Sequence, residues 1–294
     1  MRAGEANMPE LPEVQTIVND LNQKIKGETV VDFWSDWKKS LSVSIEKFKQ
    51  AIKNKKILSV ERRGKYIILN LDGGKSIVIH LKMTGHQLVK RKTQNAKRKT
   101  NEKDYFSEKV NQYIHHKFYF KSGKGLEFSD VRKFGKIILV DSEKLNRVSS
   151  INNLGIDAIS PSLTLFKLNE ILESRKTNIK ALLMNQNIIA GIGNIYASEI
   201  LHEAGILPRR ISQNLTLFER KRLLAAIKKI LKKAIRMRGT SVSDYRDASG
   251  KQGGFQKILK VYGKTGKKCA ACGTMIQREV IGQRSTFHCP KCQK

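Results

Sequence analysis

The four cysteines near the carboxyl end constrain this chain more than any other feature. Cys269 and Cys272 form one C-x-x-C pair, and Cys289 and Cys292 form a second pair after sixteen intervening residues. Two such pairs across a β-hairpin suit a tetrahedral zinc ion. Two disulfides are the alternative, but the cytosol keeps thiols reduced and adjacent C-x-x-C pairs are typical metal knuckles. We expect one structural Zn²⁺, because four thiolates leave no open position for catalysis.

The charge of the chain indicates a polyanionic partner. With 57 Lys+Arg and 26 Asp+Glu, the formal net charge is +31. Such a strongly basic balance is the usual electrostatic footprint of nucleic-acid binding, and a generally solvated basic surface is the alternative. No apolar run approaches the roughly 18 residues of a membrane span, and no signal-peptide pattern opens the chain. We expect a cytosolic protein that binds nucleic acid and no membrane.

Hydrophobic periodicity divides the chain into a β-rich half and a helical half. Apolar residues recur at helical spacing from Leu11 to Ile25, and β-branched runs with glycine turns follow as far as Asp141. From about Leu163 onward the apolar period is 3.6 and predicts several helices. The pattern therefore predicts two domains, with a joint near residues 141–155.

A basic segment interrupts the β-rich half. Residues 90–103 include seven Lys or Arg and almost no apolar side chain. This composition predicts a flexible insertion rather than a packed element. An arm that attracts phosphates and a merely solvated loop both remain open.

Six ordered motifs occur along the chain: PELPEV (9–14), GKY (64–66), HLKMTG (80–85), DVRKFG (130–135), GIGNIYASE (191–199) and the zinc hairpin with QRSTF (283–287). They resemble those of bacterial formamidopyrimidine-DNA glycosylases, the base-excision enzymes for 8-oxoguanine and ring-opened purines, over residues 8–294. The resemblance implies an α+β fold of two domains: an N-terminal β-sandwich headed by one helix, and a C-terminal helix-two-turn-helix domain with a zinc-finger β-hairpin. It also implies a cytoplasmic, nucleoid-associated monomer that acts on double-stranded DNA with oxidised bases or abasic sites.

The resemblance refines the division of the chain. It predicts an extension outside the family pattern (1–7), a catalytic β-sandwich (8–145), a linker (146–160), a helix-two-turn-helix DNA-binding domain (161–250) and a zinc finger (251–294). Residues 240–255 fall where the family keeps a mobile loop over the flipped base, and their Gly and Ser content fits a lid.

The resemblance assigns the nucleophile to the secondary amine of Pro9, once Met8 is removed. An α-amino group with a pKa near 8 is roughly one-tenth neutral at pH 7, whereas a lysine near 10.4 is neutral only about once in 2,500. Its attack on the sugar C1′ would expel the base and leave an iminium ion, which permits β- and then δ-elimination of the strand.

The seven residues before Met8 conflict with this chemistry. A proline inside a chain is an amide nitrogen with no usable lone pair, so residues 1–7 would abolish the reaction. Either the chain is a non-catalytic damaged-DNA binder, or translation begins at Met8. We expect the second, because Ala3-Gly4-Glu5 can be encoded by a stretch that contains the ribosome-binding sequence AGGAG.

Three further residues match catalytic positions of the family. Glu10 resembles the acid that protonates the sugar ring oxygen, and Glu13 matches a supporting carboxylate. Both also fit the alternative that they only stabilise the helix, because carboxylates are favoured at helix amino ends. Lys65 matches a lysine that contacts the phosphate beside the lesion, and an ordinary hairpin lysine is its alternative.

Flipping a nucleotide out of the duplex leaves a hole that must be filled. The resemblance gives this role to Met83 as a flexible filler, to Arg132 as partner of the orphaned base, and to Phe134 as a wedge. Val131 and Lys133 replace the usual Pro and Arg of this motif, which leaves the stiffness of the loop open.

Three residues of the helical half are predicted to hold DNA. Asn194 follows two glycines, and we expect it to cap a helix whose free N–H groups favour a phosphate. Lys180 corresponds to a DNA-binding position. Arg284 lies at the expected tip of the zinc hairpin, which suits insertion against DNA.

We therefore expect a bifunctional DNA glycosylase and abasic-site lyase that removes oxidised purines. An endonuclease VIII-like enzyme for oxidised pyrimidines is the alternative within enzymes. That sister family carries Gly where this chain has Leu11, so Leu11 favours the purine branch. A non-catalytic damaged-DNA binder is the alternative if residues 1–7 are retained.

Overall fold

The computed structural model describes residues 8–91 and 104–294. The predicted extension (1–7) and most of the predicted basic segment (92–103) lie outside the described residues. The described chain combines antiparallel sheets with α-helices, which confirms the predicted α+β class.

The chain divides into two compact units that interleave in sequence. Unit 1 contains Pro9, Glu13–Asn152 and Arg238–Gly253, whereas unit 2 contains Glu10–Pro12, Asn153–Met237 and Gly254–Lys294. The predicted domain boundaries stay predictions. The PELPEV motif is divided between the units: Pro9 and Glu13 belong to unit 1, whereas Glu10–Pro12 belong to unit 2.

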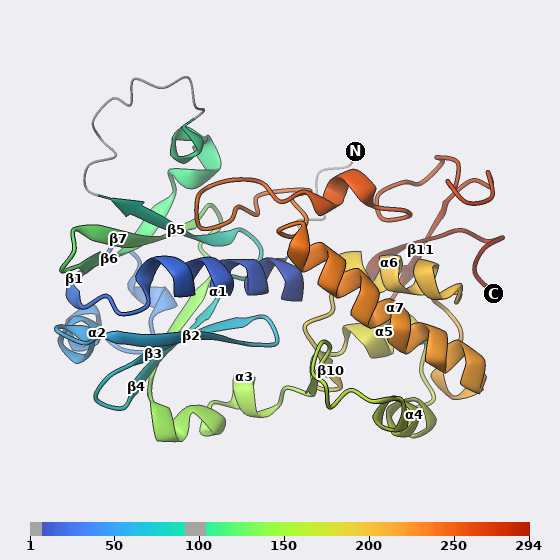
Figure 1. Ribbon diagram of the computed structural model, residues 1–294, viewed down its shortest axis with the longest axis horizontal. Helices are drawn as coiled ribbons and strands as arrows, with labels where there is room; N and C mark the ends of the chain where they lie inside the picture. The colour runs from blue at the N-terminus through green and yellow to red at the C-terminus, as the bar shows by residue number, and fades with distance from the viewer. Residues whose placement is uncertain (1–7, 92–103) are drawn as a thin grey trace. The chain divides into compact units, whose positions relative to one another are not determined.

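Unit 1 is built on two four-stranded antiparallel sheets, ordered β1-β6-β7-β5 and β2-β3-β4-β8. Apart from Leu11, the apolar stripe of helix α1 (Leu11–Ile25) shares one core with buried side chains of both sheets (Figure 1). The other elements are β1 (Val30–Ser35), α2 (Ile45–Ile52), β2 (Ile57–Arg63), β3 (Tyr66–Leu71), β4 (Lys75–His80), β5 (Gly85–Arg91), β6 (Ile114–Phe120), β7 (Lys124–Asp130), β8 (Lys136–Asp141) and α3 (Ser149–Asn152).

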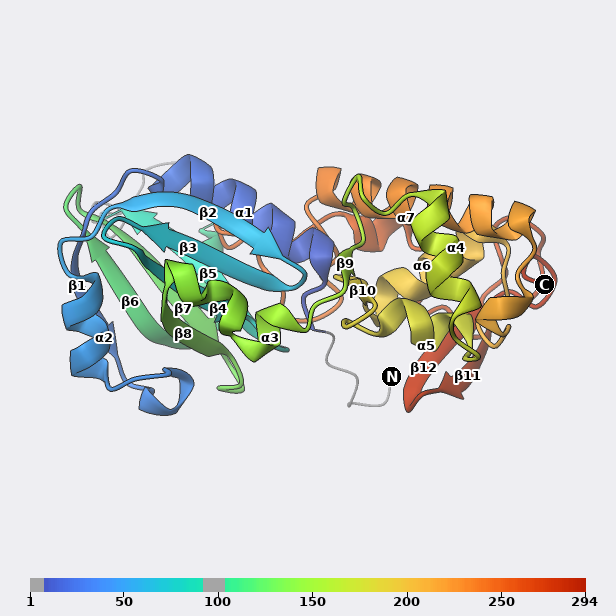
Figure 2. The same cartoon turned by 90° about the horizontal axis from the view of Figure 1, so that it is seen from below.

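Unit 2 is mainly helical. Helix α6 packs against the long helix α7 and also against strand β12, so it forms the centre of the unit (Figure 2). Thr216 and Glu219 form a reciprocal capping box that starts α7. The elements are β9 (Ile156–Asp157), α4 (Leu165–Glu173), α5 (Ile179–Met184), β10 (Ile189–Ala190), α6 (Asn194–Ala204), α7 (Leu217–Arg236), β11 (Gln277–Ile281) and β12 (Arg284–His288).

In the described part of the chain, none of the helices combines the length and the apolar character that crossing a bilayer requires.

Candidate functional site

The residue after Pro9 is bound to the amino end of α6. Pro9 is buried, and Glu10 is only 3% exposed. The Glu10 carboxylate accepts the backbone N–H of Gly193 at 2.6 Å and that of Ile195 at 2.8 Å, with Tyr196 N at 3.3 Å. The first N–H groups of a helix have no partner within the helix, and the helix dipole favours a negative charge there. Glu10 therefore supplies the anion that this helix end requires.

This arrangement corrects the prediction for Asn194. The N-cap of α6 is Gly193, and Asn194 is the first helical residue. The N–H groups that were expected to be free for a phosphate donate instead to Glu10. The side-chain Oδ1 of Asn194 is buried without a hydrogen-bond partner among the described residues. A contact of the Asn194 side chain with DNA stays a prediction.

The two glycines before Asn194 permit a close approach, but to protein side chains. A Cβ at Gly193 would lie 2.4 Å from Cδ of Glu10, and a Cβ at Gly191 would lie 2.5 Å from Cδ1 of Leu11. Atoms that are not bonded to each other do not approach this closely in proteins. The glycines are therefore explained by the packing of Glu10 and Leu11 against the start of α6.

Glu13 is bound in the same manner within unit 1. Its side chain is 2% exposed, and its Oε1 accepts the backbone N–H of Thr240 at 2.7 Å. The preceding Gly239 has φ +78°, and a Cβ there would lie 2.7 Å from Oε1 of Glu13. A residue with a side chain would displace the carboxylate. Glu13 thus fastens the segment that follows α7 to the first turn of α1.

A second carboxylate of α1 fastens the same segment through Arg238. The guanidinium donates to Asp20 Oδ2 at 2.6 Å and to Asp247 Oδ2 at 2.7 Å. Both carboxylates are buried, whereas Arg238 itself is 45% exposed and has the left-handed φ of +63°. Sequence reasoning missed this network, because Asp20 lies 218 residues from Arg238 and no local pattern connects them. The predicted lid is, in this structure, a segment held against α1.

Lys65 lies in a positively charged turn. The turn joins β2 to β3, uses Gly64 at φ +54°, and leaves Lys65 9% exposed. Burial is the main cause that lowers the pKa of the neighbouring His80 to about 3, and the charges of Lys82 and Lys65 contribute to this shift. His80 is therefore neutral at physiological pH, and its Nδ1 accepts the N–H of Lys82 at 2.9 Å. Lys82 lies in the turn between β4 and β5, so His80 is flanked by a cation from each of two turns. A contact of Lys65 with a phosphate stays a prediction.

A buried carboxylate shapes the loop that carries Arg132 and Phe134. Asp130 is fully buried, and it accepts the N–H groups of Phe134 at 2.9 Å and of Gly135 at 2.8 Å. It also accepts the hydroxyl of Thr84, which follows Met83 in the chain. These bonds restrain the turn that carries Met83 and the loop that carries Arg132 and Phe134, although Val131 replaces the proline of the family motif.

The restrained loop presents a cation and an aromatic ring to solvent. Phe134 is 43% exposed, and the guanidinium carbon of Arg132 lies 4.7 Å from its ring centroid. Met83 is half-buried in the neighbouring turn. The structure thus brings Met83, Arg132 and Phe134 onto two turns joined through Asp130. Their contact with DNA stays a prediction.

The structure does not present Lys180 to DNA. Lys180 is fully buried in α5, and its ammonium donates to Ser285 O at 2.9 Å and to Thr286 Oγ1 at 2.6 Å. A buried ammonium requires such partners, since an unsatisfied charge away from water is costly. Lys180 therefore joins α5 to strand β12, and a direct phosphate contact is not supported by this position.

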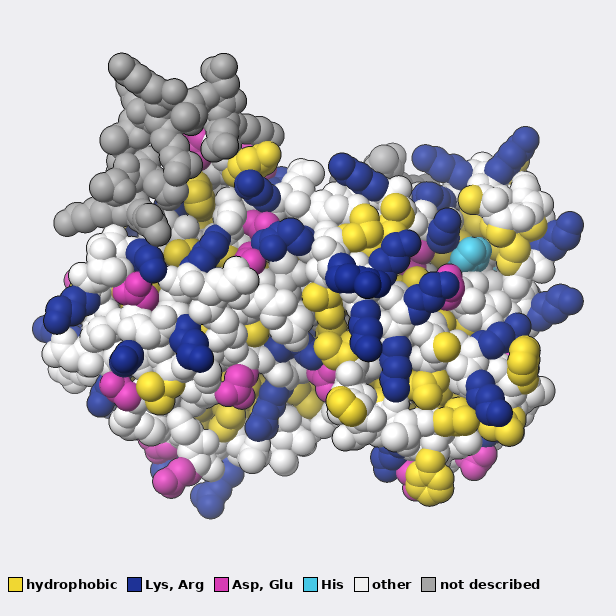
Figure 3. All heavy atoms as spheres, viewed as in Figure 1, with side chains coloured by type: hydrophobic (Ala, Val, Ile, Leu, Met, Phe, Trp, Pro, Cys, Tyr) yellow, Lys and Arg dark blue, Asp and Glu magenta, His cyan; other side chains and the backbone are white. Residues whose placement is uncertain are grey.

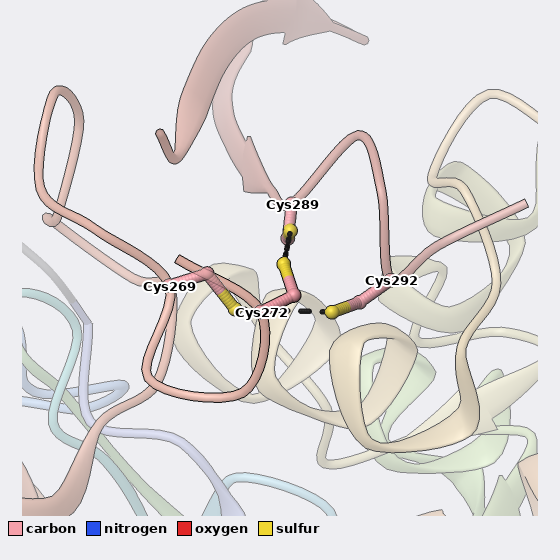
Figure 4. A group of neighbouring side chains, drawn as sticks. All are labelled: Cys269, Cys272, Cys289 and Cys292. Carbon is pink, nitrogen blue, oxygen red and sulfur yellow. Dashed lines mark hydrogen bonds between the residues drawn. The ribbon is translucent and has the colours of Figure 1, made fainter. Parts of the chain in front are cut away.

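The four cysteines converge on one point, as Figure 4 shows. Their Sγ atoms all lie within 4.8 Å of one another; Cys272 and Cys289 are 3.4 Å apart, and Cys269 and Cys292 are 3.9 Å apart. A tetrahedral zinc with Zn–S bonds of about 2.3 Å requires sulfurs about 3.8 Å apart. All four are free thiols, which excludes the disulfide alternative for this structure. The donor set fits a structural metal.

The four thiols differ in acidity. Hydrogen bonds from Thr274 lower the pKa of the Cys272 thiol to about 6, whereas burial raises the pKa of the Cys289 thiol and the hydrogen bond with Cys272 raises that of Cys292. His202 of α6 places Nε2 3.8 Å from Cys269 Sγ. Sequence reasoning missed this histidine, because it precedes the first cysteine by 67 residues.

Arg284 lies beside the hairpin turn, where the sequence predicted it. The central residues Gly282 and Gln283 both have positive φ, at +55° and +61°, as a type I′ turn requires. The Ile281–Arg284 pair closes the turn, and the Arg284 side chain is exposed. An arginine in this position is accessible to a phosphate or a base edge.

Comparison with known families gives three matches along the chain. Residues 8–137 match the formamidopyrimidine-DNA glycosylase N-terminal domain, and residues 154–246 match the H2TH domain of the same enzyme. Residues 266–294 match a zinc finger found in FPG and IleRS. The first match begins at Met8.

Individual proteins are similar over nearly the whole length. The formamidopyrimidine-DNA glycosylase of Pelotomaculum thermopropionicum is 39% identical over 288 residues, which are 98% of this chain and 99% of that protein. Lactococcus lactis Fpg in complex with abasic-site DNA has a TM-score of 0.84 and 30% identity, covering 97% of this chain and 99% of that one. Further complexes of the Lactococcus protein contain Fapy-dG DNA and oxidised-pyrimidine DNA.

Proposed function

Because this chain belongs to the formamidopyrimidine-DNA glycosylase family, whose members are DNA glycosylases of base-excision repair, we propose that it excises oxidised purines and then cuts the abasic strand. The observation that carries the proposal is the state of Glu10, a buried carboxylate directly after Pro9 that is held by the backbone of α6. A carboxylate fixed next to the proposed nucleophile can exchange protons with a substrate without reorganising.

In the proposed reaction the secondary amine of Pro9 attacks C1′ of the damaged nucleotide. The bond between C1′ and the base breaks, and the base leaves with the bonding electrons and takes a proton from water. The proton that the attacking amine releases passes to the Glu10 carboxylate, which gives it to the ring oxygen as the sugar ring opens and the amine nitrogen and C1′ form an iminium ion. This ion accepts the electrons released at C2′, so the 3′ phosphate and then the 5′ phosphate are eliminated.

The amine exists only when Pro9 is the first residue of the protein. The family match that begins at Met8 supports translation from this methionine, followed by its removal. Glu13 and Lys65 have supporting roles in the proposal. Glu13 positions the first turn of α1, and Lys65 binds the phosphate beside the lesion.

The exposed loop of unit 1 has the chemistry to occupy a vacated base position. Phe134 offers an apolar wedge, Arg132 offers donors to the orphaned base, and Met83 offers a flexible filler. Their restraint by Asp130 supports this role, because an ordered loop loses less entropy on binding.

The four thiols support one structural zinc ion. When bound, the ion would hold the base of the hairpin that presents Arg284. Cys269, Cys272, Cys289 and Cys292 would be its ligands.

Borohydride trapping tests the proposal. The protein is expressed once from Met1 and once from Met8, and each form is mixed with a duplex that contains 8-oxoguanine opposite cytosine. We expect a crosslink at Pro9 only in the Met8 form, located by mass spectrometry. Damage-selective binding with no crosslink in either form would instead identify a non-catalytic damaged-DNA binder.

Lesion preference is measured on the same preparation. Excision from the 8-oxoguanine duplex is compared with excision from a thymine glycol duplex. Faster excision of thymine glycol would favour the endonuclease VIII-like alternative.

A further inference from the structure

Helix α7 has a strongly basic exposed face. It contains eight basic residues and one acidic residue, and its apolar side is buried in the core of unit 2. Figure 3 shows Lys and Arg side chains gathered along this helix. We define the α7 basic face as six exposed cations and the half-buried Lys228: Lys221, Arg222, Lys228, Lys229, Lys232, Lys233 and Arg236.

The usual stabilising roles of surface cations do not account for this face. The helix dipole favours cations in the last turn, which covers Lys233 and Arg236 but not the residues before them. Among the described residues, the ion pairs of this face are limited to Lys229 with Glu203.

The cations of the face also oppose one another. Lys228 and Lys232 are four residues apart, as are Lys229 and Lys233, and like charges at this spacing repel. The face therefore carries electrostatic repulsion that a row of anions would relieve.

The α7 basic face is separate from the candidate site of unit 2. Helix α6 packs against both α7 and β12, so it lies between them. Figure 2 shows α7 along one side of the unit and the β11–β12 hairpin, which carries Arg284, along the opposite side. A duplex that contacts the hairpin would leave the α7 basic face open.

We propose that the α7 basic face binds the phosphate backbone of a second DNA duplex. Apart from Leu217 and Phe218 in the first turn, the large apolar side chains of α7 are buried or half-buried, and Arg222 lies over the Phe218 ring, so the face offers little hydrophobic surface for insertion into a membrane. From Lys221 to Arg236 the helix rises about 22 Å, which matches roughly six to seven base pairs of duplex. This inference goes beyond the proposed function and does not depend on catalysis.

A two-duplex binding experiment tests the proposal. The protein is first saturated with an unlabelled duplex that contains tetrahydrofuran, an abasic-site analogue. An undamaged fluorescent duplex is then titrated in, and its anisotropy is measured at several salt concentrations. We expect the second duplex to bind, with a log–log salt slope that reports several released counterions.

Matched charge variants locate the second site. The test variant carries Lys228→Gln, Lys229→Gln, Lys232→Gln and Lys233→Gln, since glutamine preserves helix propensity. The control variant loses the same charge from unit 1 through four exposed lysines: Lys26→Gln, Lys47→Gln, Lys53→Gln and Lys56→Gln. We expect the test variant to lose at least tenfold in affinity for the second duplex and about three units of salt slope, with a loss under twofold in the control.

Three outcomes would overturn the proposal. The saturated wild-type protein could fail to bind a second duplex, both variants could bind it equally, or poly-glutamate of equal charge could compete as well as DNA. Excision of 8-oxoguanine by each variant checks folding. Second-duplex binding by a protein that excises nothing would refute the proposed function and leave this inference intact.

Discussion

The carboxylate Oε2 of Glu10 lies 2.6 Å from the backbone N of Gly193, so the residue after Pro9 closes the amino end of α6. The two residues are 183 positions apart in the chain. The same carboxylate satisfies a helix end and is the proposed proton donor. Substitutions at either residue should therefore affect both stability and catalysis.

Gly193→Ala should reduce excision by at least about a hundredfold, since a misplaced catalytic group costs this much. The new Cβ would lie 2.4 Å from Glu10 Cδ and must displace the carboxylate. Single-turnover excision of 8-oxoguanine from the Met8 form measures the effect. Gly125→Ala is the control, because its Cβ would find the nearest atom at 3.4 Å. Equal rates in both variants would show that the position of Glu10 is irrelevant.

Glu10→Gln should lower excision by about a hundredfold to ten-thousandfold, the usual contribution of a general acid or base. It should also reduce the free energy of unfolding by about 1 to 3 kcal/mol, because the amide turns an N–H group toward a backbone N–H donor. Binding to a tetrahydrofuran duplex should persist. Full activity in this variant would remove Glu10 from the proposed mechanism. Glu46→Gln on exposed α2 is the control.

Asp20→Asn should weaken the attachment of residues 238–253 to α1. The expected loss is about 1 kcal/mol, a low value because Arg238 is 45% exposed and solvent screens the pair. Urea unfolding followed by tryptophan fluorescence measures it, since both tryptophans, Trp34 and Trp37, belong to unit 1. A double-mutant cycle with Arg238→Met should show coupling, and additive effects would contradict a direct interaction.

Cys289→Ser should release the metal and lower DNA affinity, because the hairpin that presents Arg284 depends on the four thiolates. Elemental analysis measures the metal, and fluorescence anisotropy measures binding. The tryptophan unfolding transition of unit 1 should keep its midpoint. Tight DNA binding by the metal-free variant would refute the role of the hairpin.

Acidification should destabilise unit 1 through His86. Burial is the main cause that lowers the pKa of His86 to about 4, from 6.5 in the unfolded chain. Below pH 6.5 His86 takes up a proton in the unfolded chain but not in the folded chain. The free energy of unfolding therefore falls as the pH decreases toward 4. At about 1.4 kcal/mol per unit, the loss reaches roughly 2 kcal/mol at pH 5.

His86→Gln isolates this contribution. Glutamine can still donate to Asn111 Oδ1, which accepts from His86 Nε2 at 2.7 Å. Urea midpoints are compared between pH 7.5 and pH 5 in wild type and variant. The free energy of unfolding should fall more in the wild type than in the variant over this range. His80 and His116 are present in both proteins, so their titration cancels in the comparison. Parallel losses would show that His86 binds protons equally in the folded and unfolded states.

The sequence by itself determined the metal knuckles, the α+β class and the turns that carry Lys65, Phe134 and Arg284. These features depend on local spacing: a C-x-x-C pair, a period of 2 or 3.6, or a glycine where φ must be positive. The family motifs could be recognised for the same reason, because each lies within ten consecutive residues.

Only the tertiary structure decided how the charged groups are paired. Glu10 takes the N–H groups that were expected to be free beside Asn194, Lys180 is buried against β12, and Arg238 joins two aspartates. Apart from Arg238 and Asp247, which are nine residues apart, these partners are 106 to 218 residues apart. A buried polar group forms a hydrogen bond with whichever partner the packing brings within about 3 Å. Such a pairing produces no periodic pattern in the sequence from which it could be predicted.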